Sequence, residues 1–131
     1  MIKKINNTQR YNYLSATLAF LLWGTWSFYI NFHQGSLQEG IVSGLAQGIS
    51  SFIITLFMTY LIEKQFNFYH HKVLKLLLPP LCTVLLTGSC LLIVHHIVQT
   101  PNILKTVTPA LTVALCFAFF TNFKLYQQLK G

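Results

Sequence analysis

The chain has 131 residues, of which 53% are hydrophobic and only 8% are charged. Soluble domains carry about 25% charged residues, so this composition excludes an ordinary water-facing surface. Nine Lys and Arg residues outnumber two acidic residues and give a net charge of +7. These cations stand in short clusters beside apolar runs rather than in one stripe, so we expect no nucleic-acid partner. The length suits a single membrane domain over residues 1–131.

Four apolar runs follow one another along the chain, each with about the 20 residues that cross the hydrocarbon of a bilayer. They cover residues 13–32, 40–62, 76–98 and 102–123. Because links between the first and second and between the third and fourth runs are short, neighbouring runs should pack antiparallel. The sequence therefore predicts an all-α integral membrane protein with four transmembrane helices in a compact bundle.

The positive charges predict the orientation of these spans. The N-terminal tail, the link between spans two and three and the C-terminal tail hold all the cations except Lys105. Lys and Arg accumulate on the cytoplasmic side of membrane proteins, so both termini are predicted to be cytoplasmic. Arg10 is the single arginine, and the ends are rich in Lys, Asn and Ile. This is typical of an AT-rich bacterial genome, so the expected location is the inner (cytoplasmic) membrane of a bacterium, as a multi-pass protein.

Prolines mark the starts or bends of spans three and four. Pro79 and Pro80 remove two backbone donors and clash with the preceding turn. Either they kink span three, or the helix restarts there and frees residues 66–77 as an amphipathic helix on the inner leaflet. Thr100 and Pro101 predict the cap and first turn of span four. Basic residues before the double proline are predicted to contact lipid headgroups; these are His70, His71, Lys72 and Lys75.

Small residues recur at helical spacing in span two. Gly40, Gly44 and Gly48 are four residues apart, and Ser51 continues the same face. Such a face lets another helix backbone approach closely, so these residues are predicted to pack helices, within the bundle or between subunits. The alternative is a groove past which a lipid or hydrophobic substrate moves. Since four helices leave little interior, we expect membrane lipids and a homo-oligomer or another membrane protein as partners.

Polar side chains within the spans are candidates for a polar path or for partner contacts: Trp23, Gln47, Thr87 and, one turn into span four, Lys105. The amide of Gln47 must find a partner in hydrocarbon and should point inward. Trp23 lies away from the interfacial aromatic belts, so its indole N–H should face the bundle or a partner. Lys105 should reach the headgroups or pair with Glu39 or an anionic substrate. For Gln47 and Thr87, ordinary helix–helix contacts are the alternative.

Residues suited to catalysis or metal binding are sparse. No carboxylate lies at the centre of a predicted span, and no nucleophile or phosphate-binding motif is present. The small multidrug transporters are similar in size and span number, but their first helix carries an essential glutamate that residues 13–32 lack. His33, His95, His96 and Glu39 lie near one interface, yet adjacent helical histidines point about 100° apart. We therefore expect no enzymatic activity, catalytic residue, cofactor or metal.

Two functional classes follow from this sequence. The first is a non-catalytic accessory or interaction subunit of a larger membrane system, which docks through span two. The alternative is a small transporter or a lipid-linked, flippase-like translocation component that uses the mid-depth polar residues. The lack of embedded charge favours the first class over ion-driven transport, but it does not count against movement of lipids or neutral solutes.

Overall fold

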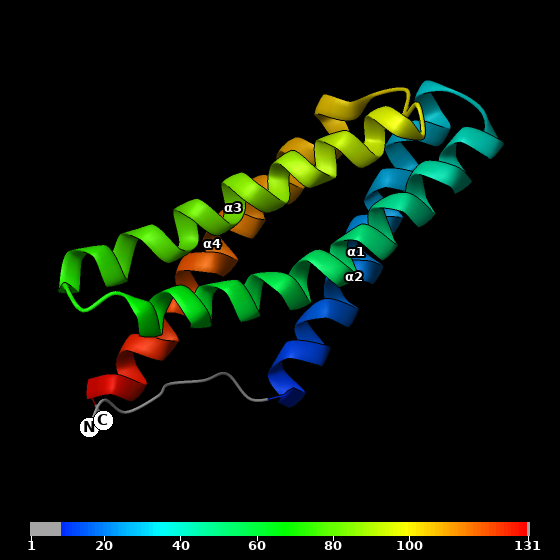
Figure 1. The fold of residues 1–131 in the computed structure, drawn as a ribbon. Helices are drawn as coiled ribbons and strands as arrows, with labels where there is room; N and C mark the ends of the chain where they lie inside the picture. The colour runs from blue at the N-terminus through cyan, green and yellow to red at the C-terminus, as the bar shows by residue number, and fades with distance from the viewer. Residues whose placement is uncertain (1–8, 131) are drawn as a thin grey trace.

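The computed structural model describes residues 9–130, and within them the chain forms four helices and no strand. In chain order these are α1 (Gln9–Gln34), α2 (Leu37–Phe68), α3 (Lys72–Ile97) and α4 (Ile103–Lys130). The α1–α2 and α3–α4 turns lie together at one end of the bundle, here called the two-turn end (Figure 1). The α2–α3 turn lies at the opposite, one-turn end, with the start of α1 and the end of α4. The predicted all-α architecture is confirmed.

Three of the described helices, α2, α3 and α4, are long and apolar enough to span a membrane. Their large apolar side chains are widely exposed; Leu85 is 73% exposed and Ile93 58%. Water would disfavour such a surface, whereas lipid tails solvate it, so the three helices indicate a membrane-embedded protein. α1 is not among the three, and its sequence contains polar side chains such as Thr25, Ser27 and Asn31.

Residues 66–77 do not form a separate interfacial helix. Of the two alternatives predicted for the segment before Pro79 and Pro80, this one is therefore wrong. α2 continues to Phe68, and α3 begins at Lys72. Phe66 is fully buried in the bundle, which anchors the end of α2 there. The His71 Nδ1 atom accepts from the Val73 N–H at 3.3 Å and caps the start of α3. The Lys75 ammonium group donates to the Phe66 carbonyl and covers the C-terminus of α2.

The helix α3 continues through Pro79 and Pro80 because a neighbouring helix supplies the missing donors. Two successive prolines leave the carbonyl groups four residues earlier, those of Lys75 and Leu76, without a helical N–H partner. The Asn122 Nδ2 group of α4 donates to both oxygens, at 3.0 Å each. Asn122 is 1% exposed, so this contact replaces hydrogen bonds that neither water nor lipid could supply there.

A side chain of another helix also supplies the missing donor at Pro109 in α4. This proline leaves the carbonyl of Lys105 without its helical donor. The indole N–H of Trp26 in α1 donates to that carbonyl, with an Nε1–O distance of 3.0 Å. The contact at Pro79 and Pro80 therefore also links α3 to α4, and the contact at Pro109 links α1 to α4.

The glycine face of α2 packs against α1. A Cβ atom built on Gly40 would lie 2.9 Å from the Phe32 Cβ and 3.0 Å from the Phe32 Cα. One on Gly44 would lie 3.0 Å from the Phe28 Cβ and 3.2 Å from the Gly24 carbonyl oxygen. The two backbones are thus in near contact, and these glycines face α1 of the same chain.

Alanine at Gly40 should destabilise the bundle far more than alanine at Gly88. The added methyl at Gly40 meets α1 backbone, so the two helices must separate, at a cost of about 1–3 kcal/mol. At Gly88 the nearest atom is Leu111 Cδ2 at 3.2 Å, the end of a flexible side chain, so we expect less than about 1 kcal/mol. Unfolding by SDS titration in mixed micelles measures both values. Equal losses for Gly40→Ala and Gly88→Ala would contradict the α1–α2 packing.

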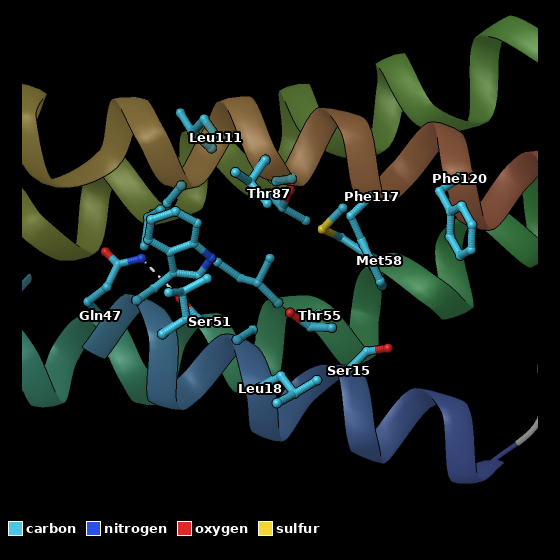
Figure 2. A pocket seen from close by; sticks show the side chains of 18 of the residues that line it. Ser15, Leu18, Gln47, Ser51, Thr55, Met58, Thr87, Leu111, Phe117 and Phe120 are labelled. Carbon is cyan, nitrogen blue, oxygen red and sulfur yellow. Dashed lines mark hydrogen bonds between the residues drawn. The ribbon is translucent and has the colours of Figure 1, made fainter. Parts of the chain in front are cut away.

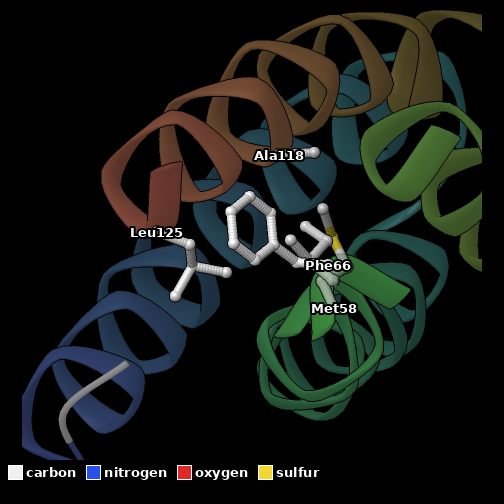
Figure 3. Packing of buried hydrophobic residues seen from close by; sticks show 5 residues of the cluster. Met58, Phe66, Ala118 and Leu125 are labelled. Carbon is white, nitrogen blue, oxygen red and sulfur yellow. The ribbon is translucent and has the colours of Figure 1, made fainter. Parts of the chain in front are cut away.

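The one-turn half of the bundle holds an apolar core (Figure 3). Its buried members come from α2 and α4: Met58, Ile62, Phe66, Ala118 and Leu125. The two-turn half is instead packed around buried polar side chains, so the two ends of the bundle are stabilised differently.

Candidate functional site

A cavity of about 310 Å³ lies inside the bundle and is lined by all four helices. This volume is at the lower end of the roughly 300–1,000 Å³ typical of small-molecule sites. Figure 2 shows Ser15 and Leu18 of α1 on one side and Leu111, Phe117 and Phe120 of α4 on the other. Most of the wall is aliphatic or aromatic, so the cavity suits an apolar occupant.

The cavity opens sideways between α1 and α4. Leu18 and Leu22 of α1 line it and are 57% and 56% exposed, and Phe120 of α4 lines it and is 61% exposed. The two helices meet near both ends: Trp26 contacts the Lys105 carbonyl, and the Tyr11 hydroxyl lies 2.9 Å from the Thr121 hydroxyl. The gap between these contacts faces the surface that lipid would cover, and we call it the lateral opening.

The wall opposite the lateral opening is polar and belongs mainly to α2. Gln47, Ser51 and Thr55 follow one another at four-residue spacing and are buried, with Thr87 of α3 beside them. The Gln47 Nε2 group donates to the Ser51 Oγ at 2.9 Å (Figure 2). The cavity therefore has an apolar lumen with a short row of uncharged polar groups on one side.

A buried hydrogen-bonded network holds this polar wall in place. The His95 Nε2 lies 2.5 Å from the Gln47 Oε1, and its Nδ1 lies 2.6 Å from the Thr100 hydroxyl. A carboxamide oxygen can only accept, so Nε2 carries the proton and Nδ1 accepts from Thr100. His95 and Gln47 are both fully buried. Because a carboxamide separates His95 from Ser51, the network orients the wall and offers no continuous path for protons.

The network continues to α1 and α4 at the two-turn end. The Ser43 hydroxyl donates to the Thr100 hydroxyl at 3.3 Å, and the Ser27 hydroxyl donates to the Ser43 carbonyl at 2.9 Å. The Asn31 amide donates to the Thr106 hydroxyl at 2.8 Å and accepts from the Asn102 N–H at 3.0 Å. Polar groups from every helix are thus mutually satisfied, and such bonds specify one arrangement of helices.

The four candidates for a polar path divide into two groups. Trp23, Gln47 and Thr87 line the same cavity, although they come from three different helices. Gln47 points inward and is paired, as the cost of an unpaired amide requires. Lys105 does not line the cavity and is exposed, and its backbone carbonyl rather than its ammonium group makes the contact with Trp26. Glu39 closes a capping box with Ser36 at the start of α2.

The four residues predicted to pack helices lie in two different places. Gly40, Gly44 and Gly48 face α1, so this face of α2 is already covered by the chain itself. Ser51 does not take part in this packing and lines the cavity instead. A partner that docks on this protein must therefore use a surface other than the α2 glycines.

Residues predicted at the headgroups lie at the one-turn end. His70, His71 and Lys72 are exposed there. Lys75 differs, because its ammonium group points onto the end of α2 and lies 4.2 Å from the centre of the Phe66 ring. Its position on the first turn of α3, directly across from Phe66, turns it inward.

The histidines near the two-turn end are not gathered around a common point. His95 is buried in the network, whereas its neighbour His96 is exposed, in line with the angle between adjacent helical positions. Among the described residues, no group of three His, Cys, Asp or Glu side chains is placed to hold a metal ion.

Several residues of the site were not predicted as site residues from the sequence. Asn31, Ser27 and Thr106 have no motif, and Thr100 was expected only as a helix cap. The structure caps α4 with Asn102, whose Oδ1 accepts from the Lys105 N–H at 3.1 Å, and leaves Thr100 to the network. A usable signal was the four-residue spacing of Ser27 and Asn31, which places both on one face of α1.

Comparison with known proteins adds no assignment, since no family model, curated protein or solved structure matches this chain.

Proposed function

We propose that this chain is a four-span protein of the cytoplasmic membrane whose cavity holds the chain of a lipid-like molecule, as a carrier or translocation component. The lateral opening between α1 and α4 supports this most directly, because it connects an apolar lumen with the lipid-covered surface. α1 has 26 residues and a length of about 39 Å at about 1.5 Å per residue, enough to cross the bilayer beside α2. Both termini are proposed to be cytoplasmic, because the start of α1 and the end of α4 lie at the one-turn end with Lys64, Lys72 and Lys75.

A binding role without catalysis fits the groups on the wall. The polar side chains that line the described cavity are hydroxyls, one carboxamide and one indole, with no carboxylate, imidazole, amine or thiol among them. General acid–base or nucleophilic chemistry needs such groups, whereas binding and release of a lipid chain do not. An accessory subunit was expected to dock through the α2 glycines, and α1 covers that face, so we place the function in the cavity.

The proposal predicts that filling the cavity blocks uptake of a lipid chain. In membranes labelled with a diazirine-bearing fatty alcohol, light should attach the probe to Ser51 and Thr55, which bulk lipid does not reach. Ala19 and Ala114 line the cavity from opposite sides, so Ala19→Phe and Ala114→Phe should each reduce labelling of these α2 residues at least about tenfold by steric exclusion. Peptide mass spectrometry locates and measures the attached probe.

The control is Ala46→Phe, which makes the same change on α2 outside the cavity. Circular dichroism in detergent shows whether each variant keeps its helices. Labelling confined to lipid-facing residues such as Leu85, with none on Ser51 or Thr55 in the unmodified chain, would contradict the proposal.

A further inference from the structure

Three hydrogen-bond donors on the cavity wall have no acceptor in the described part of the chain. Within residues 9–130, neither the indole N–H of Trp23 nor the hydroxyl of Thr55 has a hydrogen-bond partner. The Ser51 hydroxyl accepts from Gln47, but its own proton has no acceptor in the described part of the chain. Donors left unpaired in an apolar site are costly, so these three groups suit an occupant that supplies an acceptor.

The network determines what Ser51 offers to an occupant. The His95 Nε2–H is directed to the Gln47 oxygen, and the Gln47 amide is directed to the Ser51 Oγ. The Ser51 oxygen accepts one hydrogen bond and its proton remains available to an occupant, and the indole of Trp23, which lines the same cavity, can only donate. The available protons of Trp23, Ser51 and Thr55 therefore favour an occupant with an oxygen that accepts hydrogen bonds.

The lining of the described cavity excludes an anionic acceptor, because it offers no positive charge. No Lys, Arg or His side chain lines the described cavity, so a carboxylate or phosphate there would be buried without a counter-ion. Ser51 also lies about 21 Å along α2 from Leu37, close to the middle of this 32-residue helix. Phospholipid headgroups do not reside at that depth, whereas neutral lipids dissolve there.

We propose that the cavity binds a neutral lipid through a carbonyl oxygen, of an ester or a quinone, held by Trp23, Ser51 and Thr55. Its hydrocarbon chain occupies the apolar lumen towards Phe117 at the one-turn side. This inference rests on the proposed binding of a lipid chain and adds the chemical group that is recognised.

The test compares competitors of equal chain length for the diazirine fatty alcohol on the purified full chain in detergent. An alkyl methyl ester and an alkyl benzoquinone should compete at about tenfold lower concentration than the alkane that lacks a carbonyl. The relative potency of ester and quinone distinguishes the two sources of the carbonyl. Ser51→Ala and Trp23→Phe should each reduce the carbonyl advantage about fivefold, because each removes one donor. Ser51→Ala nearly keeps the shape of the wall, whereas Trp23→Phe also replaces the indole by a smaller ring.

In both variants the ester and the quinone should lose potency relative to the alkane, and the matched control Ser50→Ala, outside the cavity, should retain the full carbonyl advantage. Equal potency of alkane, ester and quinone in the unmodified chain would overturn the carbonyl assignment and leave lipid binding intact, as expected if water occupies the polar wall. No labelling of α2 by the probe itself would overturn the proposed function as well.

Discussion

Replacement of Asn122 by leucine should cause one of the largest losses of stability available from a single residue. Leucine has a similar size but cannot donate, so the carbonyls of Lys75 and Leu76 lose their partner. A buried carbonyl without a partner costs about 1–3 kcal/mol, and here there are two. SDS titration in mixed micelles should show this loss as a shift of the unfolding midpoint.

The two prolines provide a specific control for Asn122. In a Pro79→Ala, Pro80→Ala background, backbone N–H groups return and helical hydrogen bonds satisfy both carbonyls. Asn122→Leu should then cost less than about 1 kcal/mol, so the double-mutant cycle should show strong coupling. An undiminished loss in the proline-free background would show that Asn122 acts by some other contact.

Replacement of His95 by leucine should have an effect of similar size at the opposite end of the bundle. The change removes both ring nitrogens and leaves the Gln47 carboxamide oxygen and the Thr100 hydroxyl without His95 as partner in a fully buried place. At about 1–3 kcal/mol for each group, the loss should exceed that of any single glycine substitution on α2. It should also release Gln47 and Ser51 from their fixed orientation and weaken carbonyl binding.

His96 is the matched control, because it is the adjacent residue on α3 and is exposed. His96→Leu should change the unfolding midpoint by less than about 0.5 kcal/mol, as surface substitutions usually do. Thermal and SDS unfolding of the two variants provide the comparison. Equal stability of His95→Leu and the unmodified chain would show that the network contributes nothing to the fold.

The sequence predicted four membrane-spanning helices, because long apolar runs in a bilayer must satisfy their backbone polar groups within each helix. The structure has four helices, three of which are long and apolar enough to span a membrane. The sequence also predicted close packing at Gly40 and Gly44, since glycines four residues apart leave a flat face. It could not say which helix would cover that face. The answer depends on α1, where Gly24 allows the second backbone to approach, and one glycine in a span carries no clear signal by itself.

The side chains that complete the proline sites show a second limit of reasoning from sequence. Pro79, Pro80 and Pro109 each required an external donor, and that requirement follows from the covalent structure of proline. The identity of the donors, Asn122 and Trp26, depends on how different helices meet in the folded bundle. The amphipathic alternative for residues 66–77 failed for a related reason, because Phe66 was needed in the core.

The cavity was the least predictable feature. Trp23, Gln47 and Thr87 were singled out because polar groups are expensive in hydrocarbon, yet the sequence could not place three helices around one space. The inward direction of His95 likewise required the structure. The sequence does not distinguish His95 from its neighbour His96, yet His95 is buried and His96 is exposed.

Native mass spectrometry of the full chain, extracted in mild detergent from its own membranes, tests most directly whether the cavity holds a lipid. We expect the unmodified chain and Ala46→Phe to retain one neutral lipid per chain, and Ala19→Phe to lose it. An unmodified chain that carries no lipid, or an adduct that survives in Ala19→Phe, would contradict the account.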